Sequence, residues 1–423
     1  MKKVMLKTTL SLAVTVASTQ IFAAGFAINE HSISGMGTGY AGRSSSADDA
    51  STVYGNPAGM SRITREQITG GVAFLDAKTD ISDASSSPNG GSNKGDMVPF
   101  TSVPMGYYVK PIDEHWAFGL GVYVPFGLIT DYENGFAGRY FGSKSEVKII
   151  TFQPTVSYKF NDVVSIGFGP TINRIDGSLE SNLSITQAAP DGKVKIKGDD
   201  TALGYNIGVL VQATDSTRLG LTYHSKVDYK LDGNTKVNYG VLGAIGLGAN
   251  QKYDASLKIT TPESVDLSVT QAINDRWNVY AGTTWTRWSQ LEKITVKNSG
   301  VQPLLAGQFG EITEEQNWHD TWAYAIGTSY QLNKEWVLRT GLTFDQSPTN
   351  NVDRSPRIPT GDRTIFSIGA GWSPTEDLTI DVAYSYLKEE KVNIRNENDR
   401  GQSYNSQYEN SANGFGVGAT YRF

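Results

Sequence analysis

The amino-acid sequence predicts an all-β protein, a 14-stranded antiparallel transmembrane β-barrel with an N-terminal helical plug in its lumen. Three observations lead to this prediction. The first 24 residues read as a secretory signal, and the chain from residue 67 to residue 423 alternates apolar and polar residues. Short turns also alternate with long loops along that same stretch, which is typical of outer-membrane barrels.

Residues 1–24 have the layout of a cleaved signal peptide. Three lysines among the first seven residues precede an apolar stretch over residues 10–17, and Ala23 and Ala24 supply a small-residue cleavage site. The apolar stretch is too short to span a bilayer, so it is no membrane anchor. Cleavage after Ala23 and cleavage after Ala24 both fit, and the mature chain therefore begins near Gly25.

The composition excludes several classes of protein. No run of eighteen apolar residues follows the signal, which excludes a helical membrane protein. The chain has no cysteine, and a closed barrel needs no disulfide because its hydrogen-bond ladder has no free edge. The net charge of −6 is spread along the chain, so we expect no nucleic acid partner.

The segment 67–423 is predicted to form the barrel. Its last stretch places Phe415, Val417 and Tyr421 on one face and mostly glycine and threonine on the other. In a soluble sandwich the bulky face would point inward. Here the opposite face is mostly small and polar, which suits a lumen that another part of the chain fills.

The connections give the strand count. Six short turns alternate with seven long loops, so thirteen connections join fourteen strands and both ends of the barrel lie on the periplasmic side. A large soluble β protein with surface hairpins is the alternative, but nothing in it requires this strict alternation. The short turns lie near 111–115, 161–163, 214–217, 273–276, 332–335 and 373–377, and the long loops near 80–100, 131–146, 178–199, 232–252, 296–312, 346–361 and 388–408.

Residues 25–66 do not alternate and are rich in small residues, which predicts a compact domain of short helices and turns. A lumen of fourteen strands is too wide for wall side chains to close, so we expect this segment to plug it. A periplasmic tail is the alternative. The plug would include the motif Asn56-Pro57-Ala58.

Several motifs together resemble the FadL family of outer-membrane long-chain fatty acid transporters, whose relatives import aromatic hydrocarbons. They are the segments 24–30, 34–37 and 41–50, the motif Asn56-Pro57-Ala58, and the later pieces 125–128, 288–290, 344–348 and Phe423. The resemblance runs the whole length of the chain. It implies fourteen strands with an N-terminal hatch, and passive uptake of hydrophobic compounds.

The third strand, near residues 116–130, carries the predicted exit. Its alternate apolar residues are expected to face lipid, and these are Trp116, Phe118, Leu120, Val122 and Val124. The segment Pro125-Phe126-Gly127 then interrupts the ladder, because proline lacks a backbone donor. A kink in this strand is a feature of FadL-type proteins, and the resemblance implies that cargo leaves sideways there. A bulge that merely bends the strand is the alternative.

Two outer loops are unusually apolar, and we expect them to form a hydrophobic groove where cargo lands. Packing of short helices on one another is the alternative. The candidate residues are Leu242, Ile245, Leu247, Leu304 and Leu305.

For the carboxylate head group of a fatty acid, the candidates are Arg174 and His319. In the fatty-acid members we expect a lysine at the second position, so His319 keeps monoaromatic hydrocarbons open as cargo. By alternation Asp345 and Arg363 point into the lumen, where we expect them to bond the plug, for example at Asn56, rather than the cargo.

Other functions fit less well. The four histidines form no recognisable nucleophile or metal-ligand pattern, so we expect no enzyme such as a lipid hydrolase, no metal and no cofactor. A general porin needs an open polar lumen, which the plug contradicts. We expect a monomer in the bacterial outer membrane, in contact with lipid and lipopolysaccharide, that transports a hydrophobic small molecule.

Overall fold

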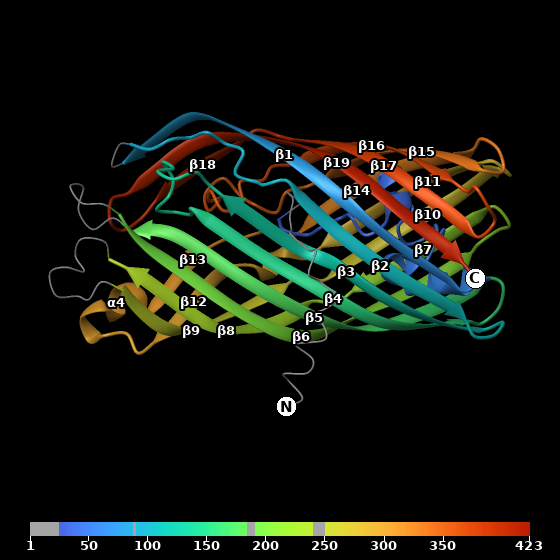
Figure 1. The fold of residues 1–423 in the computed structure, drawn as a ribbon, viewed down its shortest axis with the longest axis horizontal. Helices are drawn as coiled ribbons and strands as arrows, with labels where there is room; N and C mark the ends of the chain where they lie inside the picture. The colour runs from blue at the N-terminus through green and yellow to red at the C-terminus, as the bar shows by residue number, and fades with distance from the viewer. Residues whose placement is uncertain (1–24, 88–89, 184–190, 240–249) are drawn as a thin grey trace.

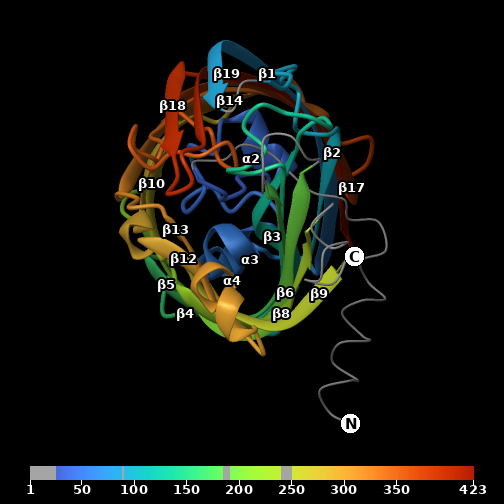
Figure 2. The same ribbon diagram turned by 90° about the vertical axis from the view of Figure 1, so that its left-hand side faces the viewer.

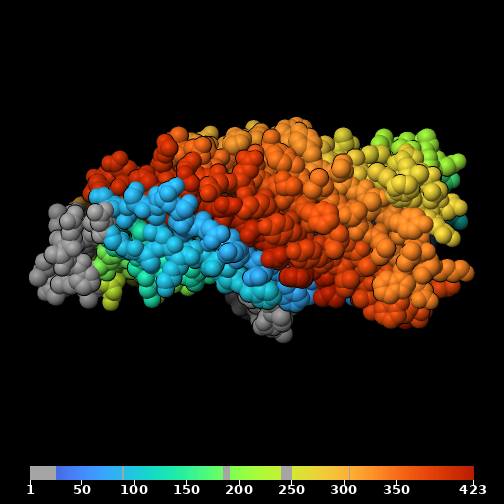
Figure 3. Space-filling view, turned by 90° about the horizontal axis from the view of Figure 1, so that it is seen from above, coloured from blue at the N-terminus to red at the C-terminus, as the bar shows by residue number. Residues whose placement is uncertain are grey.

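The computed structural model describes residues 25–87, 90–183, 191–239 and 250–423, so the signal segment 1–24 lies outside it. From Gln67 onward these residues form one closed antiparallel sheet (Figure 1). The first strand pairs with the last from Gln67↔Arg422 to Ser87↔Ser403, which closes the barrel. In Figure 3 the blue first strand lies against the red last strand along the surface.

The described residues contain nineteen strand segments, and five spanning strands each consist of two successive segments, which leaves fourteen strands as predicted. The interrupted strands are β7–β8, β9–β10, β11–β12, β13–β14 and β17–β18. The bounds are β1 Gln67–Ser87, β2 Thr101–Pro111, β3 Trp116–Asp131, β4 Lys144–Lys159, β5 Val164–Leu183, β6 Gly192–Gln212, β7 Thr217–His224, β8 Val227–Asn238, β9 Asn250–Thr261, β10 Ser264–Asn274, β11 Trp277–Thr286, β12 Lys293–Ser299, β13 Glu311–Glu315, β14 Thr321–Gln331, β15 Trp336–Asp345, β16 Arg363–Trp372, β17 Leu378–Glu389, β18 Val392–Glu397 and β19 Ser403–Arg422.

All six predicted short turns lie between strands at one end of the barrel, the end that also holds the C-terminus (Figure 1). The predicted loops at 178–199 and 232–252 are wrong in extent. β5 and β6 stay paired as far as Leu183↔Gly192, and β8 and β9 as far as Asn238↔Asn250. A sheet that leaves the bilayer no longer needs an apolar outer face, so its sequence resembles that of a loop.

The faces of the strands have the predicted polarity. Large apolar side chains are exposed on the outside, with Leu203 at 74% and Ile326 at 61% of their surface accessible. The inward positions carry mostly small or polar residues such as Thr222 and Ser367, which are buried. Because the exposed belt is apolar, its favourable surroundings are lipid rather than water.

The segment before β1 lies inside the lumen (Figure 2). It contains α2 (Ile33–Gly37), α3 (Thr52–Gly55) and the 3-10 helix η1 (Pro57–Arg62), and β1 begins at Gln67. No helix among the described residues is long and apolar enough to cross a membrane. Wall glycines let the plug approach closely: a Cβ added to Gly220 would lie 1.8 Å from the Ser44 carbonyl oxygen.

Candidate functional site

The plug is attached to the wall through the motif that begins at Asn56. The Asn56 amide donates to the carbonyls of Ser44 at 2.7 Å and of Val209 in β6 at 2.9 Å. Its side-chain oxygen accepts from the Ala58 amide at 3.0 Å and so caps η1, with Pro57 in the first turn. The motif therefore links two parts of the plug to a membrane-spanning strand.

Asn56, the example named as the plug partner of Asp345 and Arg363, is wrong, because its amide bonds Ser44 and Val209 instead. A bond of the Asp345–Arg363 pair to another part of the plug stays a prediction. Both side chains do point inward, but the Arg363 Nε donates to Asp345 Oδ2 at 3.1 Å, and the two are cross-strand neighbours on β15 and β16. A contact between this wall and the plug lies nearby, where the Thr343 hydroxyl donates to the Gly39 carbonyl at 2.7 Å. Sequence alternation fixed the direction of these side chains but not their partners.

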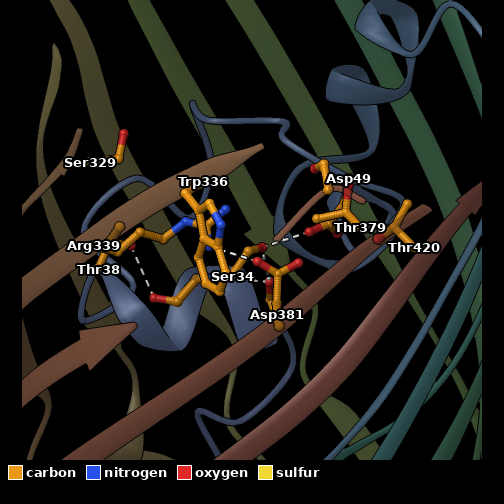
Figure 4. A network of polar contacts seen from close by, with 12 residues as sticks. Ser34, Thr38, Asp49, Ser329, Trp336, Arg339, Thr379, Asp381 and Thr420 are labelled. Atoms are coloured by element: carbon orange, nitrogen blue, oxygen red, sulfur yellow. Dashed lines mark hydrogen bonds and ion pairs between the residues drawn. The ribbon is translucent and has the colours of Figure 1, made fainter. Parts of the chain in front are cut away.

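A second polar cluster lies where α2 meets the wall (Figure 4). Arg339 of β15 pairs with Asp381 of β17 at 2.6 Å. Within the plug, the Ser34 hydroxyl donates to Asp49 at 2.6 Å. The backbone of Gly37 packs on Arg339, since an added Cβ would lie 3.2 Å from the arginine Cβ. The plug therefore packs against an arginine whose charge is already neutralised by an aspartate of the wall.

The third strand contains the expected irregularity. Tyr123 pairs with Thr151, and Phe126 pairs with Ile149. Between these two pairs β3 has one more residue than β4, which is a β-bulge. The prediction that Val124 faces lipid is wrong: only 4% of Val124 is exposed, because the bulge shifts the alternation and turns this side chain inward.

Beside the bulge, β3 also stops pairing with β2, its neighbour on the other side. Among the described residues, pairing of β2 with β3 ends at Gly106↔Val122. The start of the plug pairs with β3 instead, through a bridge between Ala27 and Phe126. The Ile28 amide donates to the Pro125 carbonyl at 2.9 Å, and the Gly127 amide to the Phe26 carbonyl at 2.8 Å.

Aromatic rings surround the same plug segment. The Phe26 ring lies 5.7 Å from that of Phe126, 5.0 Å from Trp288 and 6.0 Å from Trp318, measured between centroids. Gly25 has a φ of +66°, and an added Cβ would lie 2.6 Å from Trp318. The first described residue therefore fits between the two tryptophans only because it is glycine.

Two cavities lie on either side of this aromatic cluster of Phe26, Phe126, Trp288 and Trp318. The outer cavity holds about 810 Å³ of empty space, part of it open to solvent, and its walls are apolar, with Phe26 at one side. The inner cavity holds about 1110 Å³, is also partly open, and is more polar, with Phe126 and Trp288 among its lining residues.

A stack of three rings lies beside the inner cavity, which two of them, Tyr54 and His224, line. His31 stacks on Tyr54 at 3.8 Å, and Tyr54 on His224 at 4.7 Å. Burial lowers the pKa of the His31 imidazole well below its usual range, so this ring stays neutral at physiological pH. Within the described part of the chain, no group of three acidic or histidine side chains could hold a metal ion.

Residues 14–423 match the family model described as "Outer membrane protein transport protein (OMPP1/FadL/TodX)". The chain belongs to this family. It is 31% identical to the long-chain fatty acid transport protein of Escherichia coli O6:H1 (strain CFT073), over all of this chain and 99% of that one. It is 28% identical to outer membrane protein P1 of Haemophilus influenzae, over 91% and 90% of the two chains.

The fold is similar to solved structures of the same family. A FadL homologue of Pseudomonas aeruginosa matches with a TM-score of 0.83 and 27% identity, covering 95% of this chain and all of that one. The toluene transporter TodX of Pseudomonas putida matches with a TM-score of 0.67 at 19% identity, over 95% and 100%, and this likeness concerns the fold alone. The predictions of an outer-membrane location and of a transport protein rather than an enzyme are confirmed.

The two head-group candidates do not lie in either cavity. On β5 the side chains of Asn173 and Ile175 point inward, so Arg174 between them points outward, where it pairs with Asp199 at 2.8 Å and Asp176 at 3.3 Å. His319 lies exposed in the connection between β13 and β14. Alternation along β5 could have predicted that Arg174 points outward, whereas no such pattern applies to His319, which lies outside any strand.

The predicted outer groove can be followed only in part. Leu242, Ile245 and Leu247 lie outside the described residues. Leu304 belongs to a 3-10 turn, Pro303–Leu305, and Leu305 is buried in a cluster with Phe309 and Tyr239 rather than open to the outside. For Leu305, packing within the loops is therefore the better description.

The loop between β15 and β16 was predicted near 346–361, but its packing into the barrel mouth was not. Ile358 of this loop packs with Phe26 and Leu291, and Arg357 lines the outer cavity. The signal was present in the sequence as an apolar and basic segment, Arg354 to Pro359, in a region that was expected to be a polar loop.

Proposed function

We propose that the protein takes up hydrophobic compounds passively across the outer membrane, above all long-chain fatty acids, and releases them sideways through the wall at β3. The proposal rests on the order in which two cavities, an aromatic cluster and a strand kink follow one another through the barrel. An apolar outer cavity, the aromatic cluster around Phe26, the inner cavity and the kink at Pro125 follow one another through the barrel.

Capture needs only the apolar outer cavity. Each buried methylene of an acyl chain gains about 0.8 kcal/mol on leaving water, so a long chain enters readily and its release is the harder step. Release becomes possible if the cargo itself changes the arrangement of the barrier beyond it. Phe26 lines the outer cavity, so a filled cavity competes with this ring for space.

The plug segment 25–28 is the element that would respond. When Phe26 leaves the aromatic cluster, the bridge between Ala27 and Phe126 is lost with it, and the edge of β3 beside β2 becomes free. A ligand drives this change only if it binds the displaced arrangement better than the closed one. Cargo then passes from the inner cavity past Pro125 into the lipid.

The relatives support fatty acids as the cargo. The match named a long-chain fatty acid transport protein spans both chains almost completely. Monoaromatic hydrocarbons remain the alternative cargo, since they require the same apolar walls. We expect the protein to act as a monomer, with lipopolysaccharide around its outer strands.

The test is uptake of labelled oleate by cells that lack their own fatty-acid transporter, with and without this protein. We expect uptake to be restored, and to disappear when Asn56-Pro57-Ala58 is deleted from a barrel that still assembles. A correctly assembled barrel without oleate uptake contradicts the fatty-acid proposal, and toluene uptake by the same cells would then support the hydrocarbon alternative.

A further inference from the structure

The outer cavity has one polar end. Most of its lining is aliphatic, including Leu231, Leu257 and Ile294. The charged residues of its lining are Lys197, Glu314 and Arg357; Glu314 bonds Arg357 and Gln316, whereas Lys197 is exposed. An apolar cavity with one charged end has the shape of a site for a molecule with an apolar tail and a charged head.

Arg357 is held firmly in this position. Its Nη1 donates to the carbonyls of Lys144 at 3.1 Å and Glu180 at 3.2 Å and to the Ser145 hydroxyl at 3.0 Å. Only 10% of its side chain is exposed. Gly142 makes the room, since a Cβ there would lie 2.7 Å from the Arg357 Cγ. A guanidinium fixed by backbone carbonyls is a built anion site rather than a mobile surface charge.

A carboxylate already occupies the site. Glu314 accepts from Arg357 Nε at 3.0 Å, from the Ser355 hydroxyl at 3.0 Å and from the Gln316 amide at 3.3 Å. Three donors on three residues therefore converge on one carboxylate at the end of an apolar cavity. The Glu314 side chain is 28% exposed, so it can turn to solvent while Arg357 stays in place.

We propose that the carboxylate of the cargo replaces that of Glu314 and binds Arg357, Ser355 and Gln316. This inference rests on the proposed function and deepens it, because it makes the cargo an amphiphile with a carboxylate head. Arg357, rather than Arg174 or His319, is then the residue that selects acids over neutral hydrocarbons.

The position of the site also gives the cargo a direction. Arg357 bonds Ser145, four residues along β4 from Ile149, the partner of Phe126. That separation is about 13 Å along the strand. A tail that starts at Arg357 and enters the apolar part therefore extends toward the aromatic cluster, where it meets Phe26.

The test compares binding of oleate and of its neutral methyl ester to the purified full-length protein. Arg357→Gln should weaken oleate binding roughly tenfold or more and change methyl oleate binding by less than about twofold. Arg357→Lys should restore part of the loss. Glu314→Gln should have the opposite effect and tighten oleate binding, because the competing carboxylate is removed.

Arg354→Gln is the matched control. Arg354 is a buried arginine of the same loop, bonded to Thr349 and the Thr360 carbonyl, and it lines neither cavity. Its loss should leave the ratio of oleate to methyl oleate affinity unchanged. If Arg357→Gln fails to fold, Glu314→Gln and Arg357→Lys still decide the question.

Two results with the variants overturn the inference alone: an unchanged affinity ratio in Arg357→Gln, or weaker oleate binding in Glu314→Gln. Equal affinity of the unaltered protein for oleate and methyl oleate overturns it as well, while fatty-acid uptake stands. An unaltered protein that binds neither ligand contradicts the proposed function together with the head-group site. The two failures are therefore distinguishable.

Discussion

Ala27 of the plug and Phe126 of β3 form an isolated antiparallel bridge, at the place where β2 has already left β3. Two backbone hydrogen bonds flank it, to the Pro125 carbonyl and from the Gly127 amide. Unpaired backbone groups are costly within a bilayer, so this short pairing stabilises the gap in the wall when the plug is closed. The same pairing must break if cargo is to leave there.

A reversible covalent lock tests this requirement. Antiparallel partners have Cα atoms about 4.5–5.5 Å apart, which lies within the reach of a disulfide. The chain has no cysteine, so the pair Ala27→Cys/Phe126→Cys introduces only this bond. We expect oxidised cells to lose oleate uptake at least tenfold and to regain it after reduction.

The two single-cysteine variants are the controls, and their uptake should not respond to oxidation. Uptake that continues through the oxidised double variant would mean that residues 25–28 need not move. The lateral exit next to them would then lose its main support.

Deletion of Pro125 tests the exit itself. The bulge has one residue too many on β3, so removing Pro125 restores regular pairing with β4 between Tyr123 and Phe126. Val124 then faces lipid, as alternation requires. We expect oleate still to bind to the purified protein, because the outer cavity is untouched, while uptake into cells falls to background.

Deletion of Asp113, in the short turn between β2 and β3, is a control for the loss of one residue outside the kink. Its transport should stay close to that of the unaltered protein. Normal uptake by the Pro125 deletion, with the barrel folded, would contradict release through the third strand.

Alternation and turn chemistry are local, which is why the strand number, all six short turns and the inward direction of Asp345 and Arg363 could be predicted. The errors have physical causes. A bulge shifts alternation by one residue, so Val124 was assigned to the wrong face. Strands beyond the bilayer lose their apolar face, so those around 178–199 resembled loops.

The contacts of the site depend on residues that are distant in the chain. Asn56 bonds Val209, 153 residues away, and Arg357 bonds Ser145, 212 residues away. No periodicity relates such positions, so one sequence cannot assign their partners. Arg174 was a candidate for the head group, yet it lies between two inward-facing residues of β5 and points outward.

Asn56→Ala should loosen the plug. The substitution removes the cap of η1 and the amide that bonds the buried Ser44 carbonyl and the partly buried Val209 carbonyl, at a cost of about 1–3 kcal/mol. We expect more frequent ion-conducting openings in planar bilayers. The control is Ser61→Ala, which removes one bond within η1 and should leave conductance unchanged. Equal conductance of both variants would mean that Asn56 does not hold the plug.

The Asp345–Arg363 pair lines the inner cavity but is expected to stabilise the closed wall rather than bind cargo. The two side chains are 8% and 2% exposed, and removing one charge from a buried pair costs about 3–5 kcal/mol. Asp345→Asn should therefore lower the free energy of unfolding by roughly this amount in equilibrium urea unfolding. Asp162→Asn, which breaks a surface pair whose aspartate is 96% exposed, should leave the free energy of unfolding unchanged, because water screens an exposed pair. Oleate affinity should be the same in both variants, because the head group binds in the outer cavity; weaker binding in Asp345→Asn alone would instead assign the pair to the cargo.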